Sequence, residues 1–267
     1  MKRKSLAGKG IVVTRPAHQA RELTRLISAA GGKPLPFPVI EIRDIEDPAP
    51  LLALIDRLDE FNMAVFVSPN AAEKGMSLVK ARRQWPAKLK AAAVGSGGLK
   101  VLQRHGVADV IAPQGRFDSE ALLELPAFAH VFGRRIVVFR GVGGRELLSE
   151  TLAERGAAVE YAECYRRMRP DSDATPLLRA WERDELDAIT VTSSEGLRNL
   201  LDMLGARGRE NALATPIFVP HPRIAETASR LGIRKVVVTG PGDEGLLTGL
   251  SAFFSAPRHA GRGAQTG

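Results

Sequence analysis

The chain alternates between short apolar runs and longer segments whose apolar residues recur every three or four positions. Residues 11–13 (IVV) and 136–139 (IVVF) are apolar throughout, and each run leads into a segment with helical periodicity. Gly31 and Gly156 follow these segments, as glycine commonly does where an α-helix ends. This order predicts strand–helix units.

Further apolar or β-branched runs lie at residues 64–67, 188–192 and 235–238. Strands that are apolar on both sides are typical of a parallel sheet covered by helices on both faces. The pattern therefore predicts an α/β fold with doubly wound parallel sheets.

The pattern also repeats. Three pairs of segments occur in the same order at an offset of 125 residues: 10–32 with 135–157, 64–73 with 189–198, and 92–106 with 217–232, the last with one inserted residue. Three matches at one offset indicate an internal duplication and two similar domains.

The repeat leaves the arrangement of the domains open. A simple tandem would place the boundary near residue 125. Alternatively, segments 34–45 and 158–167 are long enough to cross between domains, and the first strand–helix unit would then join the last part of the chain.

Charge narrows the ligand class. The chain has 38 Lys and Arg against 30 Asp and Glu, a net charge of +8, which attracts nucleic acid, a membrane surface or a small polyanion. Aromatic residues make up only 5%, too few for a platform that stacks single-stranded nucleic acid. No nucleic-acid-binding motif is present, so a small anion is favoured.

Cysteine and histidine usage indicates neither disulfides nor metal. Cys164 is the only cysteine, which fits a reducing compartment and a buried strand residue, and the five scattered histidines offer no zinc site. No signal sequence or membrane span is recognisable. We expect a cytoplasmic protein, with residues 258–267 disordered.

Small and polar residues follow the predicted strands of both copies. Ligands bind beyond the carboxyl ends of parallel strands, where helix openings offer free backbone N–H groups and a positive dipole end. The candidate anion-binding residues at these positions are Thr14, Arg15, Ser68, Asn70, Ser96, Ser193, Ser194, His221 and Arg223. Taken one at a time, the serines are better interpreted as plain N-caps, a role that is compatible with anion binding.

Residues 140–146 (RGVGGRE) begin like a nucleotide-binding turn. However, Glu146 stands where a dinucleotide-binding turn has its third glycine, and no phosphate loop with Gly-Lys-Ser/Thr is present, which disfavours NAD and ATP. Gly143 and Gly144 suit a close approach of the backbone to a ligand. The guanidinium groups of Arg140 and Arg145 suit carboxylates or phosphates, although Arg145 also fits a solvated helix face.

Tyr165 lies on the predicted strand after this helix. Its counterpart in the first copy is Ile40, so the duplication is not symmetric here. A hydrogen-bond donor or acid is needed only once in a shared site. A packed strand tyrosine with its hydroxyl in water is the alternative.

Segment 139–167 resembles the most recognisable part of uroporphyrinogen-III synthases. Segment 12–32 is similar to their opening, and VFVSPNAAE and TVTSSEGLRNL resemble their serine-containing strand-to-helix turns. The resemblance implies two α/β domains joined by a two-stranded linker. The first would comprise residues 1–38 with 167–257, and the second residues 41–164.

The resemblance also implies a lyase. Such an enzyme cyclises the linear tetrapyrrole hydroxymethylbilane to uroporphyrinogen III, inverting ring D and losing water, as a monomer without metal or organic cofactor. Tyr165 matches the family's tyrosine proposed to help the hydroxyl leave. Hydroxymethylbilane synthase, the preceding enzyme, is a candidate partner.

Two turns depart from the family pattern. His221-Pro222-Arg223-Ile224 stands where many members have Gly-Pro-Thr-Thr, and Gly97-Gly98 leaves the matching turn of the other copy without a threonine. No threonine role is carried over to these turns. The alternative to an enzyme is a two-domain cytoplasmic protein that binds an anionic small molecule without catalysis.

Overall fold

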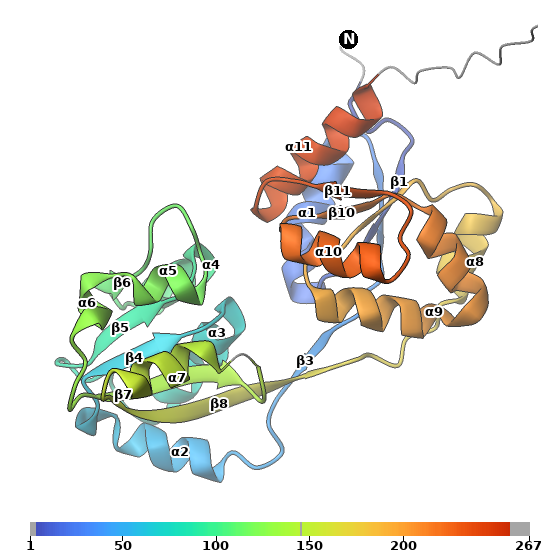
Figure 1. The fold of residues 1–267 in the computed structure, drawn as a ribbon. Helices are drawn as coiled ribbons and strands as arrows, with labels where there is room; N and C mark the ends of the chain where they lie inside the picture. Colours follow the sequence, from blue (N-terminus) through green and yellow to red (C-terminus); the bar gives the residue numbers. More distant parts are fainter. Residues whose placement is uncertain (1–3, 145, 257–267) are drawn as a thin grey trace, which may run out of the picture. The chain divides into compact units, whose positions relative to one another are not determined.

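The computed structural model describes residues 4–144 and 146–256 and divides into two compact units (Figure 1). Unit 1 holds the described residues up to Glu41 and from Met168 onwards, and unit 2 is Ile42–Arg167. Arg145 and the tail 258–267 lie outside the described residues.

Unit 1 contains one sheet in the order β11-β10-β9-β1-β2, and every neighbouring pair is parallel. Its strands are β1 (Gly10–Val13), β2 (Lys33–Pro36), β9 (Ala188–Thr190), β10 (Ile217–Val219) and β11 (Val236–Val238), and its helices are α1 (Ala17–Ala29), α8 (Thr175–Glu182), α9 (Ser194–Ala214), α10 (Pro222–Arg230) and α11 (Gly242–Ser255). Because β1 pairs with β9, the two ends of the chain share this sheet.

Helices cover both faces of the unit 1 sheet. Ile11 and Val13 of β1 pack with residues of α1 and α11, whereas Val12 between them packs with Leu197 and Leu200 of α9. Successive side chains of a strand point to opposite faces, so an all-apolar strand requires an apolar layer on each side. Each such fully buried side chain contributes roughly 1.5–3 kcal/mol.

Unit 2 contains a sheet in the order β3-β8-β7-β4-β5-β6. Its strands are β3 (Glu41–Arg43), β4 (Met63–Phe66), β5 (Lys90–Ala93), β6 (Val110–Ile111), β7 (Arg135–Gly141) and β8 (Ala158–Met168). Its helices are α2 (Ala49–Asp56), the 3₁₀ turn η1 (Leu58–Glu60), α3 (Pro69–Arg82), α4 (Ser96–Arg104), α5 (Ser119–Leu123), α6 (Pro126–Ala129) and α7 (Leu147–Glu154). The pairs from β8 to β6 are parallel.

The same two-layered burial holds in unit 2. Phe66 and Phe139 stack at 4.5 Å in the cluster that includes α3, and Val65 and Val138 lie in the cluster that includes α5 and α7. The prediction of an α/β fold with parallel sheets covered on both faces is confirmed.

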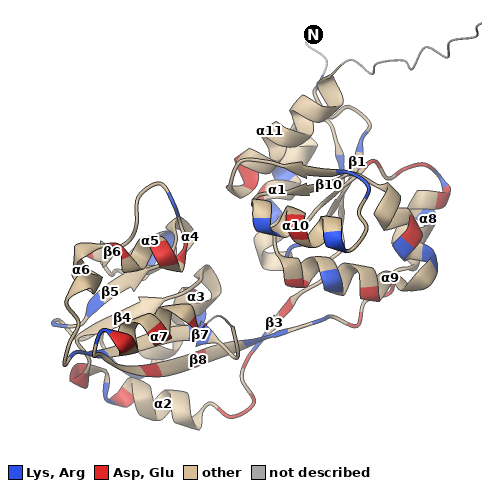
Figure 2. Cartoon of the chain, viewed as in Figure 1, with Lys and Arg blue, Asp and Glu red and all other residues tan. Residues whose placement is uncertain are grey.

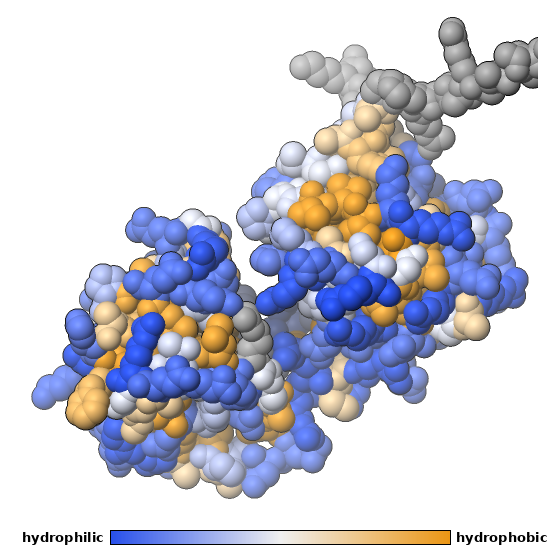
Figure 3. All heavy atoms as spheres, in the orientation of Figure 1, coloured by the Kyte–Doolittle hydropathy of each residue, from blue (hydrophilic) through white to orange (hydrophobic). Residues whose placement is uncertain are grey.

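Two local predictions have different outcomes. α1 ends at Ala29 and α7 at Glu154, just before Gly31 and Gly156, as predicted. The prediction that residues 235–238 form a buried strand is wrong. β11 is the edge strand of its sheet, its Val238 is 49% exposed, and Figure 3 shows apolar surface in this region.

Charged residues of both signs occur along the helices of unit 1 (Figure 2). Lys and Arg are interspersed with Asp and Glu along α8, α9 and α10 (Figure 2). No helix within the described residues combines the length and apolarity needed to cross a membrane.

Candidate active site

A pocket of about 190 Å³ lies in unit 2 where β4, β7 and β8 end. Its lining residues are Val67, Ser68, Ser119, Val138, Arg140, Gly141, Gly143, Gly144, Leu148, Ser149, Tyr165 and Arg167. Five of the residues that the sequence singled out therefore lie together: Ser68, Arg140, Gly143, Gly144 and Tyr165.

A β-bulge directs Tyr165 into this pocket. Arg140 of β7 lies opposite Glu163 of β8, but Gly141 lies opposite Tyr165, so Cys164 is the extra residue. As a result, Cys164 and Tyr165 belong to the same apolar cluster, although consecutive strand residues normally face opposite sides.

Tyr165 is held by its ring and by its hydroxyl. It is 3% exposed, and a Cβ added at Gly141 would lie 2.8 Å from two of the ring carbons, so only glycine leaves room for the ring. The hydroxyl oxygen lies 3.0 Å from Ser68 Oγ. The packed-ring interpretation therefore holds for the ring, while the hydroxyl has a protein partner at the pocket.

Ser68 has two roles in this geometry. It is the N-cap of α3, where its Oγ accepts the N–H of Ala71 at 3.1 Å, and the same oxygen contacts Tyr165. A hydroxyl that accepts one hydrogen bond can still donate its own proton. If Ser68 donates to Tyr165, the phenolic proton is free for a third partner in the pocket.

The glycine segment places backbone beside two guanidinium groups. Gly143 and Gly144 have φ values of 67° and 125°, which L side chains rarely adopt. A Cβ at Gly144 would lie 3.3 Å from Arg140 Nη2 and 3.8 Å from Arg167 Nη2. This wall of the pocket is thus formed by exposed backbone and positive charge, which suits an anion.

Arg140 is paired inside the protein. It is only 5% exposed, its Nε donates to the carbonyl oxygen of Gly141 at 3.3 Å, and its Nη1 donates to Glu146 Oε1 at 3.1 Å. Hydrogen bonds from Tyr161 and then from Arg140 hold the pKa of Glu146 below its usual value. The carboxylate therefore stays ionised beside the guanidinium.

Asn70 and Ser96 occupy the neighbouring helix openings of unit 2. Asn70 lies in the first turn of α3 and is partly buried. Ser96 is the exposed first residue of α4, whose N-cap is Gly95. Neither residue is among those lining the pocket described above.

The candidates of unit 1 lie after β1, β9 and β10, at one edge of their own sheet. Thr14 Oγ1 donates to the carbonyl oxygen of Thr190 at 2.8 Å, and Arg15 forms an ion pair with Asp243 at the start of α11. Ser193 accepts the N–H of Gly196 at 2.9 Å as the N-cap of α9.

The other three candidates of unit 1 are Ser194, which is partly buried, and the exposed His221 and Arg223. Ser194 Oγ lies 3.0 Å from Thr227 Oγ1. His221 is the N-cap of α10, its Nδ1 accepting the N–H of Arg223 at 3.1 Å, and both residues are exposed. Arg223 thus carries an exposed charge at a helix opening.

Cys164 plays no part in the chemistry of the pocket. It is 1% exposed, and burial raises the pKa of its thiol to about 12, which keeps the thiol protonated. The Sγ–H donates to the carbonyl oxygen of Ala162 at 3.1 Å. This agrees with the interpretation as a buried strand cysteine.

Comparison with known proteins decides the family. The family described as "Uroporphyrinogen-III synthase HemD" matches residues 21–248. The chain belongs to the uroporphyrinogen-III synthase family.

Individual relatives support this membership. The uroporphyrinogen-III synthase of Escherichia coli K12 is 31% identical over 239 residues, covering 89% of this chain and 97% of that protein. That of Synechococcus elongatus is 30% identical over 211 residues, covering 77% of this chain and 78% of that protein.

Solved structures share the fold. A mutant uroporphyrinogen III synthase from the extremely thermophilic bacterium Thermus thermophilus has a TM-score of 0.62 at 19% identity, covering 91% of this chain and 98% of that chain. The uroporphyrinogen-III synthetase from Helicobacter pylori has a TM-score of 0.55 at 18% identity, covering 90% and 97%.

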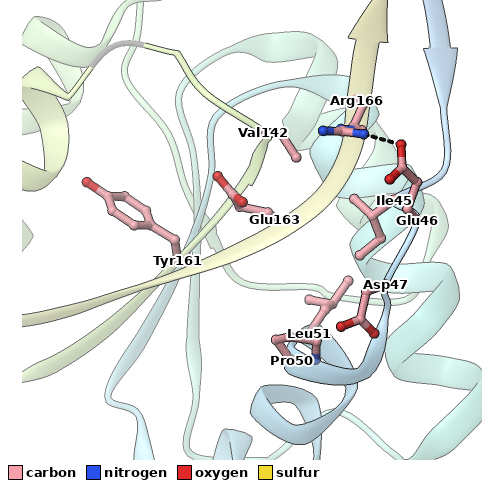
Figure 4. A pocket seen from close by; sticks show the side chains of 9 residues that line it. All are labelled: Ile45, Glu46, Asp47, Pro50, Leu51, Val142, Tyr161, Glu163 and Arg166. Carbon is pink, nitrogen blue, oxygen red and sulfur yellow. Dashed lines mark hydrogen bonds and ion pairs between the residues drawn. The ribbon is translucent and has the colours of Figure 1, made fainter.

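Unit 2 has a second pocket, of about 510 Å³, that the sequence pattern did not predict. Its lining residues are Ile45, Glu46, Asp47, Pro50, Leu51, Val142, Tyr161, Glu163 and Arg166 (Figure 4). Arg166 forms an ion pair with Glu46, and Tyr161 and Glu163 project from β8. The carboxylates make this pocket unsuitable for an anion, in contrast to the pocket at Tyr165.

Sequence reasoning also missed Arg167, Glu146 and Tyr161. Arg167 follows Tyr165 at a spacing of two on β8, so strand periodicity alone would have placed both on one face of the sheet. Glu146 was interpreted only as the residue that breaks a glycine motif. No pattern in the sequence connects it to Tyr161.

Proposed function

We propose that this protein is a lyase that cyclises hydroxymethylbilane to uroporphyrinogen III, with inversion of ring D and loss of water. The product is the precursor of haem, sirohaem, cobalamin and chlorophyll. The observation that carries the proposal is the Tyr165 hydroxyl, bonded to Ser68 in a pocket that two arginines line. Family membership supports the enzyme over a protein that only binds an anion.

Binding rests on charge. Hydroxymethylbilane carries acetate and propionate carboxylates on its rings, and the pocket offers the guanidinium groups of Arg140 and Arg167 beside the backbone of Gly143 and Gly144. Hydrogen bonds to charged groups contribute about 1.5–3 kcal/mol each. The pocket's volume of about 190 Å³ suits one substituent of the substrate rather than a whole tetrapyrrole.

In the proposed chemistry, Tyr165 donates its phenolic proton to the terminal hydroxyl as the carbon–oxygen bond breaks. Water leaves, and the electron pair of the pyrrole nitrogen stabilises the methylene carbon that remains. The substituted carbon of ring D then attacks this methylene to give a spiro intermediate. The older bond from that carbon to the methylene of ring C breaks, and this second methylene re-attaches at the free α-carbon of ring D, which inverts the ring. The proton lost when the macrocycle regains aromatic pyrroles returns to the tyrosinate, which restores the enzyme.

Positioning supplies much of the rate in this scheme. The hydroxyl leaves readily from a pyrrole methylene, so the enzyme's larger task is to bring the substituted end of ring D to the first ring. Ser68 orients the Tyr165 hydroxyl, and the rigid start of α3 orients Ser68. General acid catalysis from a group positioned in this way contributes typically about 10²–10⁴-fold.

A coupled assay tests the proposal. Hydroxymethylbilane is supplied to the purified protein, and the uroporphyrinogen isomers are oxidised and separated. The proposal expects the type III isomer. Formation of the type I isomer alone, at the rate without protein, would leave only the anion-binding alternative.

The proposal extends to a cytoplasmic monomer that needs no cofactor and receives its substrate from hydroxymethylbilane synthase. Activity after exhaustive dialysis against a chelator tests the first part, and light scattering of the purified protein tests the monomer. A binding measurement with hydroxymethylbilane synthase tests the transfer. A requirement for added metal, or a stable dimer, would contradict it.

A further inference from the structure

The side chains of Arg140, Glu146 and Tyr161, beside residues 141–144, all contact one another. The guanidinium carbon of Arg140 lies 4.6 Å from the centre of the Tyr161 ring. Glu146 Oε1 accepts from Arg140 Nη1 at 3.1 Å, and Glu146 Oε2 accepts from the Tyr161 hydroxyl. One carboxylate therefore joins two residues that belong to the neighbouring strands β7 and β8.

Burial within this set is uneven. The side chain of Arg140 is 6% exposed, whereas that of Glu146 is 47% exposed and Tyr161 is 39% exposed. A guanidinium group remains charged at any physiological pH, and burying it is costly without a partner. The carboxylate of Glu146 and the ring of Tyr161 offset this cost of burying the guanidinium group. Glu146 therefore lies at the solvent-exposed end of the buried Arg140 side chain.

Two of these three residues stand on either side of residues 141–144 in the sequence. Arg140 precedes them and Glu146 comes shortly after them, while Arg140 itself contacts the carbonyl oxygen of Gly141 and lies beside Gly144. The N–H of Val142 donates to the carbonyl oxygen of Tyr165 at 2.8 Å. The glycine segment is therefore fixed by β8 at Val142 and by Arg140 at Gly141, and the same guanidinium group lies beside Gly144.

We propose that Glu146 and Tyr161 are positioning residues, which act through Arg140 to hold residues 141–144 in the conformation that presents their backbone to a substrate carboxylate. This inference rests on the proposed function. It gives Arg140 a second role, because its contacts with Glu146 and Tyr161 order the loop in the absence of substrate.

Glycines make such a device necessary. Gly143 and Gly144 lose more conformational freedom on ordering than other residues, and both are exposed. Without the contacts of Arg140 with Glu146 and Tyr161, residues 141–144 would sample many conformations, and the substrate would have to order them on binding. The Tyr165 hydroxyl is held by Ser68, which lies outside this loop, so loosening the loop affects binding more than the proton transfer.

The experiment compares Tyr161→Phe and Glu146→Gln with the control Glu154→Gln, an exposed glutamate of α7. Tyr161→Phe keeps the ring over Arg140 and removes only the hydroxyl. We measure hydrogen exchange of the Val142 backbone amide, which is hydrogen-bonded to β8, and KM and kcat with hydroxymethylbilane. A further variant, Glu146→Asp, tests rescue by a shorter carboxylate.

We expect exchange of the Val142 amide, which is bonded to the carbonyl oxygen of Tyr165, to become about tenfold faster in both test variants, because the loss of a hydrogen bond to a charged group loosens the loop. KM should rise about three- to tenfold while kcat stays within about twofold. Glu154→Gln should leave all three quantities unchanged, and Glu146→Asp should recover part of the KM. A purely stabilising role would lower the melting temperature without this change in KM.

Exchange and KM that match the control in both test variants would overturn the inference. If Glu146→Gln does not fold, the milder Tyr161→Phe decides the outcome. If the unaltered protein forms no uroporphyrinogen III, the proposed function fails, but the exchange measurement still tests whether Glu146 and Tyr161 order the loop.

Discussion

The duplication places Arg15 of unit 1 and Arg140 of unit 2 at equivalent positions, two residues beyond the end of β1 and next to the last residue of β7. Each arginine forms an ion pair with a carboxylate of the protein, but the sequence separation between the two partners differs. Arg15 pairs with Asp243, which lies in the last helix of its unit, whereas Arg140 pairs with Glu146 at the end of its own loop. The first arginine fixes a distant segment, and the second orders a local one.

This difference shows where the two copies have diverged. Strands, helix-ending glycines and the serine N-caps Ser68 and Ser193 are retained in both units. The loops beyond the strands are not, and only unit 2 has a tyrosine at the position of Ile40, directed into a pocket by a bulge. The scaffold is duplicated, while the candidate chemistry is not.

The largest expected effect tests this asymmetry directly. Tyr165→Phe should lower kcat about 10²-fold, because the proton donor is lost, and should cost only about 1 kcal/mol of stability from the hydrogen bond to Ser68. Steady-state kinetics and thermal unfolding check both. Tyr161→Phe removes the same atom from a neighbouring tyrosine and should leave kcat nearly unchanged. Parallel losses of folding and activity in Tyr165→Phe would assign the residue to packing.

The glycine loop gives the next effect. Gly144→Ala forces a side chain into a backbone conformation with φ 125° and into contact with Arg140, which costs about 1–3 kcal/mol. We expect KM to rise about tenfold through the displaced loop. The equivalent residue of unit 1 is Gln19 in α1, and Gln19→Ala should change KM and stability little. Equal effects at both positions would remove the loop from the site.

Arg223 offers a smaller effect in unit 1. It is exposed at the start of α10, where the equivalent residue of unit 2 is the buried Gly98. If Arg223 contacts a substrate carboxylate, Arg223→Gln should raise KM about two- to fivefold at low salt, and the difference should shrink as salt screens the charge. Kinetics at two ionic strengths check this. A KM independent of both the residue and the salt would exclude the contact.

The smallest effect concerns stability. Glu160 of β8 forms ion pairs with Arg57 and then Arg135, which lower its pKa from 4.5, and its counterpart in β2 is the uncharged Leu35. A lowered folded-state pKa gives stability that is present above pH 4.5 and is lost as the pH falls through the folded value. Glu160→Gln should cost about 0.5–1 kcal/mol at pH 7, discounted for partial exposure.

Denaturant unfolding at pH 7 and at low pH measures this effect. The difference between Glu160→Gln and the unaltered chain should vanish at low pH, where the carboxylate of the unaltered chain is protonated. Leu35→Ala provides the contrast, because its cost should not depend on pH. A cost of Glu160→Gln that persists at low pH would indicate packing rather than charge.

Much of the fold could be predicted because it follows from periodicity. The all-apolar strands require two covered faces, and the constant offset of 125 residues is enough to reveal the duplication. The interpretation of residues 235–238 was wrong because apolar character does not show whether a strand lies in the middle or at the edge of a sheet. Edge position depends on strand order, which no local pattern encodes.

The candidate site was predicted in part. Ser68, Arg140, Gly143, Gly144 and Tyr165 follow neighbouring parallel strands, so topology alone brings them to one edge. The bulge at Cys164 was not predictable, because the residue looks like an ordinary strand cysteine. The pairing of Glu146 with Tyr161 depends on the register of β7 with β8, which sequence spacing does not give.

Unit 1 is assembled from both ends of the chain, and this has a consequence for biosynthesis. Strand β1 is made first, but its partner β9 follows only after all of Ile42–Arg167 has been synthesised. Unit 2 is continuous and can fold while the ribosome is still adding the rest, as contiguous domains generally do. During that interval β1 lacks its neighbour β9 and also α9 and α11, which cover its two faces, so its backbone edge and its apolar side chains are exposed. The nascent protein therefore passes through a state with one finished domain and an unpaired hydrophobic strand, the kind of surface that chaperones bind.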